Sequence, residues 1–385
     1  MFFILSILTA FSVGLLVTPI LISFLKKLKI GDTPGGRKIH KSFVPSMGGI
    51  GFFIAAFTSF GIWAWQFPLP DITYILGGIV LMFFVGLRDD IVELRASRKL
   101  LGQLLAVILI VVVADIRIKT FHGFLGIGDL NIAFSYIFTG IVLLALTNGF
   151  NLVDGLDGLA GTIAIISLSC LGGWFYIQGI ESYALISFVF LGGVLSFLVF
   201  NWHPAKIFMG DTGSLTLGFT LATLIVAFME INEGLPEGTF LKLEPTFSMS
   251  VALMIFPLYD MARVFTRRLS QGKGPMTPDK SHVHHFLMRM GLKHNQVAVL
   301  LGMLQLMVIL LVFSMSEFSD HMVLPIISLI AILLGWRLDQ VTVKYVKKKV
   351  IQAPRILESR ERNSKNKKKV RLDKESFKDT PINMN

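Results

Sequence analysis

The sequence is poor in charge and in cysteine. Of its 385 residues only 16% are charged, whereas 53% are hydrophobic and the mean hydropathy is +0.69. A soluble domain needs far more polar surface, so these values predict an integral membrane protein. The single cysteine, Cys170, lies in an apolar run and excludes a disulfide-stapled fold. We expect it to pack as a small buried hydrophobic residue.

Apolar runs long enough to cross a bilayer recur along the chain. A hydrocarbon core about 30 Å thick needs about 20 apolar residues in a helix. The first run ends at Lys26 and Lys27 and is too long for the apolar part of a signal peptide, so we interpret it as a span. Eleven spans are predicted, near residues 2–25, 47–65, 72–88, 100–118, 133–149, 159–178, 184–200, 213–229, 248–265, 297–315 and 321–337.

The basic residues predict the orientation. With the N-terminus outside, only Arg117, Lys119 and Lys242 of the 36 lysines and arginines fall on the outer side. The positive-inside bias therefore predicts an all-α membrane protein of about eleven spans with cytoplasmic catalytic loops. Residues 1–340 would form the membrane domain, and 341–385 a basic cytoplasmic tail. We interpret the tail as a solvated segment drawn to anionic lipid headgroups, with no nucleic-acid partner.

Ionisable residues are nearly absent from the middle of these spans. A transporter, the alternative from a different functional class, usually places such residues along its path through the bilayer. Here the polar clusters lie in or beside the cytoplasmic loops. This distribution favours an enzyme whose active site faces the cytoplasm and meets one water-soluble and one lipid substrate.

The first polar cluster is the carboxylate pair Asp89-Asp90 at the end of the third predicted span. Adjacent carboxylates repel unless a cation or hydrogen bonds compensate, so the pair is a candidate catalytic site. The alternative is a solvated loop that is neutralised by the basic residues around it, Arg88, Arg95, Arg98 and Lys99.

Two further clusters begin predicted spans at their cytoplasmic ends. The segment 148–161 contains Asn148, Asn151, Asp154 and Asp157, and the two aspartates would share a face of a helical turn. The segment 201–215 contains Asp211, an oxygen ligand suited to Mg²⁺, at a helix N-terminus that favours phosphate. Each aspartate is also open to a simpler interpretation as a helix cap.

The remaining clusters lie in loops. His282, His284 and His285 are in the longest cytoplasmic loop, where contacts to phosphate or sugar are favoured over a catalytic zinc, since no cysteine or dense carboxylate set accompanies them. Lys38 lies in a Gly-rich basic segment and is a candidate substrate-binding residue. Carboxylates, cations and helix N-termini facing one compartment are suited to chemistry on a pyrophosphate.

With these motifs the chain resembles the polyprenyl-phosphate N-acetylhexosamine-1-phosphate transferases, glycosyltransferase family 4. The matching elements follow the family's order: Asp89-Asp90, the segment 148–161, the segment Phe208–Leu215 and His282-Val-His-His285. Val283 interrupts the histidine triplet that is typical of phospho-N-acetylmuramoyl-pentapeptide transferases, the alternative branch. The motif instead resembles the branch that starts O-antigen, enterobacterial common antigen and teichoic acid synthesis.

The resemblance implies a reaction and a role for each motif. UDP-N-acetylglucosamine, or a related UDP-sugar, would react with undecaprenyl phosphate and release UMP at the inner membrane of a bacterium, with Mg²⁺ or Mn²⁺ as cofactor. Direct attack and an aspartyl-phosphate intermediate both stay open, as do the hexosamine, the polymer and a homodimer. By position, Asp211 would bind the metal, Asp89 and Asp90 the lipid phosphate, and His282, His284 and His285 the diphosphate or sugar. The uridine pocket would be formed by Asn151, Asp154, Gly155, Leu156, Asp157, Asn201 and Phe208, and Lys38 and Asn148 would also bind substrate. The candidate catalytic residues are Asp89, Asp90, Asp154, Asp157 and His282.

Overall fold

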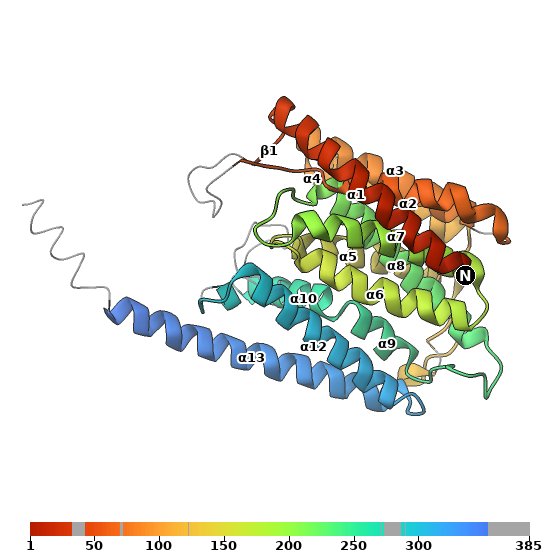
Figure 1. Ribbon diagram of the computed structural model, residues 1–385. Coiled ribbons are helices and arrows are strands. Elements are labelled where there is room, and N and C mark those ends of the chain that lie inside the picture. Colours follow the sequence, from red (N-terminus) through yellow and green to blue (C-terminus); the bar gives the residue numbers. More distant parts are fainter. Residues whose placement is uncertain are drawn as a thin grey trace, which may run out of the picture.

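The computed structural model describes residues 1–32, 43–69, 72–121, 123–270, 272, 286–288 and 290–352. Nearly all regular structure in these ranges is helical (Figure 1). The long helices of the first half are α1 (Phe2–Leu28), α2 (Gly49–Trp63), α3 (Ile72–Val92), α4 (Ala96–Ile108), α5 (Ile132–Val153), α6 (Leu159–Ile177) and α7 (Glu181–Asn201). The second half contains α8 (Gly210–Gly234), α9 (Thr246–Leu253), α10 (Ile255–Ser270), α12 (His294–Ser314) and α13 (Asp320–Gln352).

The only described sheet is a small antiparallel pair at one end of the bundle. It joins β1 (Gly31–Asp32) to β2 (Val44–Pro45). Short turns of helix follow α2 (Ala64–Gln66), continue α4 (Leu109–Val113) and lie before α5 (Phe124–Gly126). The predicted all-α membrane fold is confirmed apart from this minor pair.

Nine described helices are long and apolar enough to cross a membrane, and the bent pair α9–α10 raises the number to ten. The multi-pass architecture is therefore confirmed, whereas the count of eleven is not. The third predicted span corresponds to α3, which is not among the nine. α13 continues to Gln352, so the predicted start of the tail at residue 341 lies within a helix.

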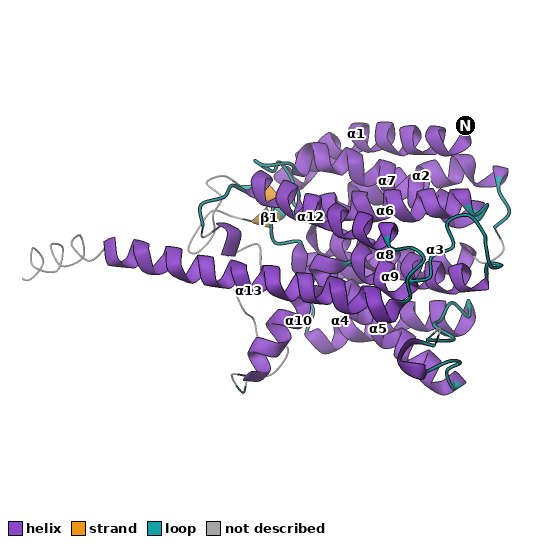
Figure 2. Cartoon of the chain, turned by 90° about the horizontal axis from the view of Figure 1, so that it is seen from below, coloured by secondary structure: helices purple, strands orange, loops and turns teal. Residues whose placement is uncertain are grey.

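α8 is the central helix of the bundle (Figure 1). Of its most apolar 18-residue window, 89% is buried, compared with 17% for α13 at the periphery (Figure 2). Small residues allow this packing: a Cβ on Gly213 would lie 2.9 Å from Cα of Gly49, and a Cβ on Gly86 would lie 2.3 Å from the carbonyl oxygen of Asp211. Close backbone approach of this kind is how helices associate where no water drives them together. It also fixes the start of α2 and the last turns of α3 against the start of α8.

The ninth predicted span, 248–265, is broken rather than straight. α9 and α10 meet at an angle of 81°. Pro257 has no N–H with which to bond the Leu253 carbonyl four residues earlier. Ser167 and Gln305 donate to that carbonyl instead, at 2.6 and 2.8 Å. The freed backbone group is thus satisfied within the protein, as an apolar environment requires.

Candidate active site

The N-terminus of α8 is capped by a carboxylate from another helix. The oxygens of Asp90, in the last turn of α3, accept hydrogen bonds from the backbone N–H groups of Asp211 and Thr212 at 2.9 and 2.8 Å. The Thr212 hydroxyl adds a third bond of 2.6 Å. A Cβ on Gly210, whose φ is +73°, would lie 2.6 Å from Asp90. Glycine is therefore required for this cap, which places Asp90 and Asp211 side by side.

A lysine joins the other two carboxylates of this region. The Lys99 ammonium group, in the first turn of α4, lies 2.8 Å from Asp89 and 3.0 Å from Asp211. Asp89 also accepts the Leu94 N–H at 2.6 Å, which shapes the turn between α3 and α4. Asp89 and Lys99 are mostly buried, so the carboxylate charges meet a fixed cation instead of bulk water. The carboxylate pair is thus part of a built site, and the solvated-loop interpretation is not supported.

The asparagines of the segment 148–161 line the same region from the last turns of α5. Asn151 donates to Asp211 at 2.5 Å and to the Ser214 hydroxyl at 2.7 Å. Asn148 exchanges two hydrogen bonds with Gln103 of α4, at 3.0 and 3.2 Å. Side chains from α3, α4, α5 and α8 therefore meet at one end of the bundle.

Asp154 follows the last residue of α5 and lies close enough to Asp90 and Asp211 for their charges to act on its carboxyl. Burial raises the pKa of its carboxyl well above the usual range, and the charges of Asp211, Asp90 and Asp157 raise it further. No described side chain donates a hydrogen bond to it. The charged form of Asp154 is therefore disfavoured unless a cation compensates it. Gly155 is exposed and Leu156 is buried in the turn that follows.

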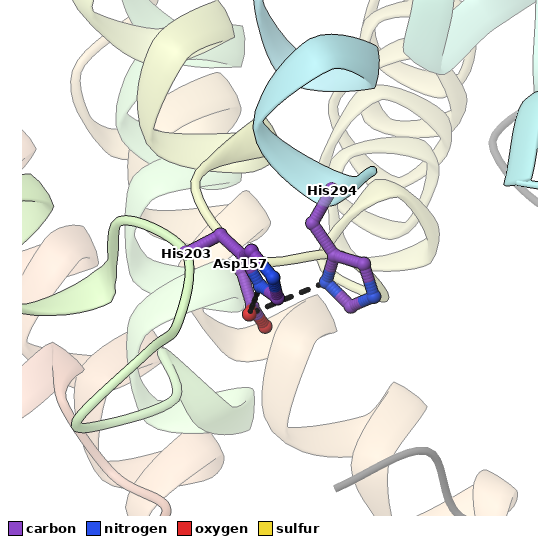
Figure 3. A group of neighbouring side chains, drawn as sticks. All are labelled: Asp157, His203 and His294. Carbon is purple, nitrogen blue, oxygen red and sulfur yellow. Dashed lines mark hydrogen bonds and ion pairs between the residues drawn. The ribbon is translucent and has the colours of Figure 1, made fainter. Parts of the chain in front are cut away.

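Asp157, in the same turn, has two histidines as its partners (Figure 3). Its carboxylate lies 2.7 Å from Nδ1 of His203 and 3.3 Å from Nδ1 of His294. Burial alone would raise the pKa of Asp157, but the hydrogen bonds from His294 and His203 outweigh it and lower the value to about 2. Asp154 and Asp157, although three residues apart, thus have different partners.

Two residues predicted for the uridine pocket support the loop before α8. Asn201 is buried, accepts the Gly158 N–H at 2.9 Å and donates to the Ile207 carbonyl at 2.9 Å. The Phe208 backbone bonds Pro45 and Gly48, while its ring is partly exposed. Asn201 therefore orders the loop through both the oxygen and the nitrogen of its side-chain amide.

The structure brings together most of the predicted residues that it describes. Lys38, His282, His284 and His285 lie outside the described residues. The sequence did not identify Lys99 as a site residue, because Lys99 is one of several cations near the Asp89-Asp90 pair. Gln103 and His294 were not predicted either. The spacing of Lys99 and Gln103, one helical turn apart after the Asp89-Asp90 pair, was the available signal.

Comparison with known proteins gives the same result as the motifs. Residues 72–229 match the family described as glycosyl transferase family 4. A protein of Bacillus subtilis (strain 168), named "Probable undecaprenyl-phosphate N-acetylglucosaminyl 1-phosphate transferase", is 33% identical over 299 residues, which are 76% of this chain and 78% of the relative. The chain belongs to glycosyl transferase family 4.

Relatives from other bacteria have similar names. The "Undecaprenyl-phosphate alpha-N-acetylglucosaminyl 1-phosphate transferase" of Escherichia coli O157:H7 is 28% identical over 317 residues, 80% of this chain and 83% of the relative. The protein of the same name from Salmonella typhi is 30% identical over 295 residues, 74% of this chain and 77% of the relative. This glycosyl transferase family 4 member is accordingly a membrane-bound sugar-phosphate transferase, as the resemblance implied.

Proposed function

We propose that the enzyme transfers N-acetylglucosamine-1-phosphate from UDP-N-acetylglucosamine to undecaprenyl phosphate and releases UMP. The observation that carries the proposal is the meeting of Asp89, Lys99, Asn151 and Asp211 at the N-terminus of α8. Oxygen donors and a cation in one place suit a metal ion and a substrate pair that brings several phosphate charges. The Asp211 and Thr212 N–H groups at this end of α8 are already bonded to Asp90. The names of the relatives support the acceptor and the sugar.

The cytoplasmic orientation of this site is part of the proposal. The ends of α3 and α5 and the starts of α4, α6, α8 and α12 lie at the site's end of the bundle (Figure 1). The three basic residues predicted outside lie near the opposite end: Lys119 N–H bonds Glu230 in the last turns of α8, Arg117 lies two residues earlier, and Lys242 follows α8. This separation favours a site that faces the cytoplasm, where nucleotide sugars are available, in the inner membrane of a bacterium.

The carboxylates of the site fit a magnesium or manganese ion. The available ligand atoms are carboxylate oxygens, with no sulfur among them, and hard cations prefer oxygen ligands. The Lys99 ammonium group lies between Asp211 and Asp89 and offsets the repulsion between their charges. No described side chain donates a hydrogen bond to Asp154. Asp211 would hold the ion, with Asp154 beside it. When bound, the ion would neutralise the pyrophosphate charge and polarise the reacting phosphorus.

The reaction requires little proton transfer to or from the protein. An undecaprenyl phosphate oxygen attacks the β-phosphorus of the nucleotide sugar, a new P–O bond forms, and the bond to the α-phosphate oxygen breaks to release UMP. The second pKa of a phosphate monoester is about 6, so the attacking group is mostly a dianion at pH 7. Asp89 is ion-paired with Lys99 and hydrogen-bonded to Leu94, which makes it a positioning group rather than a general base. Lys99 would move from the carboxylates to a substrate phosphate.

An apolar hollow that reaches from Leu146, near the site, to Ile118 and Met229, near the opposite end of the bundle, suits the polyprenyl chain of the acceptor. It lies between α5, α8 and the α9–α10 bend, and its lining includes Val142, Leu146 and Leu258. Leu146 is less than one turn from Asn148 of the site. A chain that left the hollow past Leu146 would bring its phosphate toward the carboxylates.

The test is transfer by the purified full-length protein with each donor in parallel. Radiolabelled UDP-N-acetylglucosamine and UDP-N-acetylmuramoyl-pentapeptide are each mixed with undecaprenyl phosphate and Mg²⁺, and labelled lipid and UMP are measured. We expect kcat/KM to be at least about a hundredfold higher for the first donor, which is about 2.7 kcal/mol of transition-state binding. If the muramoyl donor is preferred, the donor assignment fails; if neither donor yields UMP, the proposed reaction fails.

A further inference from the structure

A buried pair of side-chain amides joins α4 to α5 next to the carboxylate site. Gln103 of α4 is only 1% exposed. Its Nε2 donates to Oδ1 of Asn148 at 3.2 Å, and its Oε1 accepts from Nδ2 of Asn148 at 3.0 Å. Nδ2 of Asn148 also donates to the Leu144 carbonyl oxygen at 2.8 Å. Since an amide nitrogen has two hydrogens, both N–H groups of Asn148 are already used within the protein.

The amide pair lies one helical turn deeper in the bundle than the Lys99 ammonium group. Lys99 and Gln103 are four residues apart on α4, so their side chains share a face of that helix. Asn148 and Asn151 are three residues apart on α5 and share a face in the same way. Lys99 and Asn151 both contact Asp211. The same two helix faces therefore meet twice, once across Asp211 and once through the amide pair.

The position of α4 depends on few contacts because α4 is a peripheral helix. Only 28% of its apolar segment Ala96–Val113 is buried, and Leu101 and Leu105 are exposed. Lipid is as apolar as these leucines, so close packing and hydrogen bonds between helices have to hold α4 in place. Gly102 provides close packing on one side, since a Cβ there would lie 2.5 Å from Val85 of α3. The amide pair provides the hydrogen bonds on the side that faces α5.

The position of α4 matters for the reaction because Lys99 acts over short distances. Its ammonium group lies 2.8 Å from Asp89 and 3.0 Å from Asp211. Lys99 and Gln103 are on one helix, so a shift or rotation of α4 at Gln103 moves Lys99 as well. Displacement of a catalytic group by about 1 Å lowers turnover by up to about a hundredfold. The place of the cation in the site therefore depends on the amide pair.

We propose that Gln103 is a positioning residue for sugar-phosphate transfer: its amide pair with Asn148 fixes α4 against α5 and thereby places the Lys99 ammonium group between the two carboxylates. Asn148 acts through Gln103 in this arrangement, and not through a hydrogen bond that it donates to the substrate. The inference rests on the proposed transfer reaction for its kinetic test, whereas the hydrogen bonds themselves do not depend on the donor sugar.

The experiment is a double-mutant cycle of Gln103 and Lys99 in the purified full-length protein. Gln103→Met keeps the length of the side chain and removes both hydrogen bonds with Asn148. We expect kcat for UMP release to fall by about tenfold to a hundredfold. In a Lys99→Met background the same change should alter kcat by less than about twofold, because the group that Gln103 positions is gone.

A matched control and a rescue separate positioning from a general loss of stability. Gln305 of α12 is also buried and hydrogen-bonded, to Ser167 and the Leu253 carbonyl, so Gln305→Met should change kcat by the same factor in both backgrounds. The exchanged pair, Gln103→Asn with Asn148→Gln, restores two facing amides of the same total length. We expect its kcat to exceed that of either single variant by at least about fivefold.

Thermal unfolding gives a readout that needs no donor sugar. Mg²⁺ should raise the unfolding temperature of Gln103→Met by more than that of the wild type, because a displaced Lys99 competes less for the carboxylates. The exchanged pair should return to the wild-type response. A wild type that releases no UMP would refute the transfer reaction, and this Mg²⁺ response then decides about the amide pair: an unchanged response in Gln103→Met contradicts the positioning role.

Two kinetic results would overturn the proposal in an active wild type. One is a kcat of Gln103→Met within about twofold of the wild type, and the other is an equal loss in both backgrounds. If Gln103→Met does not fold, the exchanged pair decides. A folded and active exchanged pair supports the positioning role, and an unfolded or inactive one contradicts it.

Discussion

Replacing Lys99 by methionine tests the charge balance of the site. The ammonium group lies 2.8 and 3.0 Å from two carboxylates, and its side chain is only 18% exposed. At an effective dielectric of about 20, each such pair of charges attracts by about 5–6 kcal/mol before desolvation is counted. Removing one partner of a buried pair costs about 3–5 kcal/mol. Because Asp211 is 31% exposed, we expect a loss near the lower limit, about 3 kcal/mol in the free energy of unfolding.

Two measurements separate this effect from a general loss of stability. Without Mg²⁺, the unfolding temperature of Lys99→Met should fall; with Mg²⁺ it should recover by more than the wild type gains, since the ion no longer competes with the lysine. Transfer should fall about a hundredfold or more even with Mg²⁺, about 2.7 kcal/mol in activation free energy, because a phosphate loses its cation.

Lys99→Arg should retain part of the activity, and Lys27→Met, at an exposed lysine in the last turn of α1, should change neither property. Normal transfer by Lys99→Met, or an unfolding temperature that does not respond to Mg²⁺, would refute the reasoning.

Three further predictions follow from individual contacts. Asp90→Ala should lower the free energy of unfolding by about 2 kcal/mol in a reversible denaturant titration, because α8 loses its cap; an unchanged midpoint would contradict the capping role. Asp157 has a folded-state pKa of about 2 against the usual 3.8, so it stabilises the fold above pH 4 by about 2 kcal/mol, and this contribution is lost as pH falls through 2. In EDTA, the difference in stability between wild type and Asp157→Asn should therefore shrink between pH 6 and pH 3, and a constant difference would count against the His203 and His294 contacts. Truncation after Val350 should leave transfer unchanged in a protein that inserts normally, because the catalytic motifs lie earlier in the chain; a truncated protein that inserts but is inactive would show this wrong.

Much of the architecture could be predicted because it depends on local composition. Apolar runs locate the spans, and glycines and aspartates locate the starts of α6 and α8. The break between α9 and α10 was not predicted, since mean hydropathy is insensitive to it. Pro257 was the signal, but whether a proline bends a span depends on partners such as Ser167 and Gln305, which are far away in the sequence.

The site was predicted in its residue types and only in part in its pairings. Asp211, Asn151 and Asp89 were named, yet the neighbouring positions Asp89 and Asp90 have different roles: one is ion-paired with Lys99, and the other caps α8. Asp154 and Asp157 were expected to share a helical face because they are three residues apart, but both lie in the turn between α5 and α6 and only Asp157 contacts His203 and His294. Such divisions depend on side-chain direction and long-range contacts, which spacing alone does not contain.

Transfer by Asp211→Asn tests the central claim most directly. Asparagine keeps the size of the side chain and removes the charge that meets Lys99 and would hold the metal ion. The variant and the wild type, purified as folded protein, are given UDP-N-acetylglucosamine, undecaprenyl phosphate and low millimolar Mg²⁺, and UMP is measured together with the lipid product. We predict equal amounts of UMP and lipid-linked sugar from the wild type, and a loss of at least about a thousandfold in the variant, about 4 kcal/mol in activation free energy. Near-normal turnover by the folded variant would contradict a catalytic centre at the N-terminus of α8.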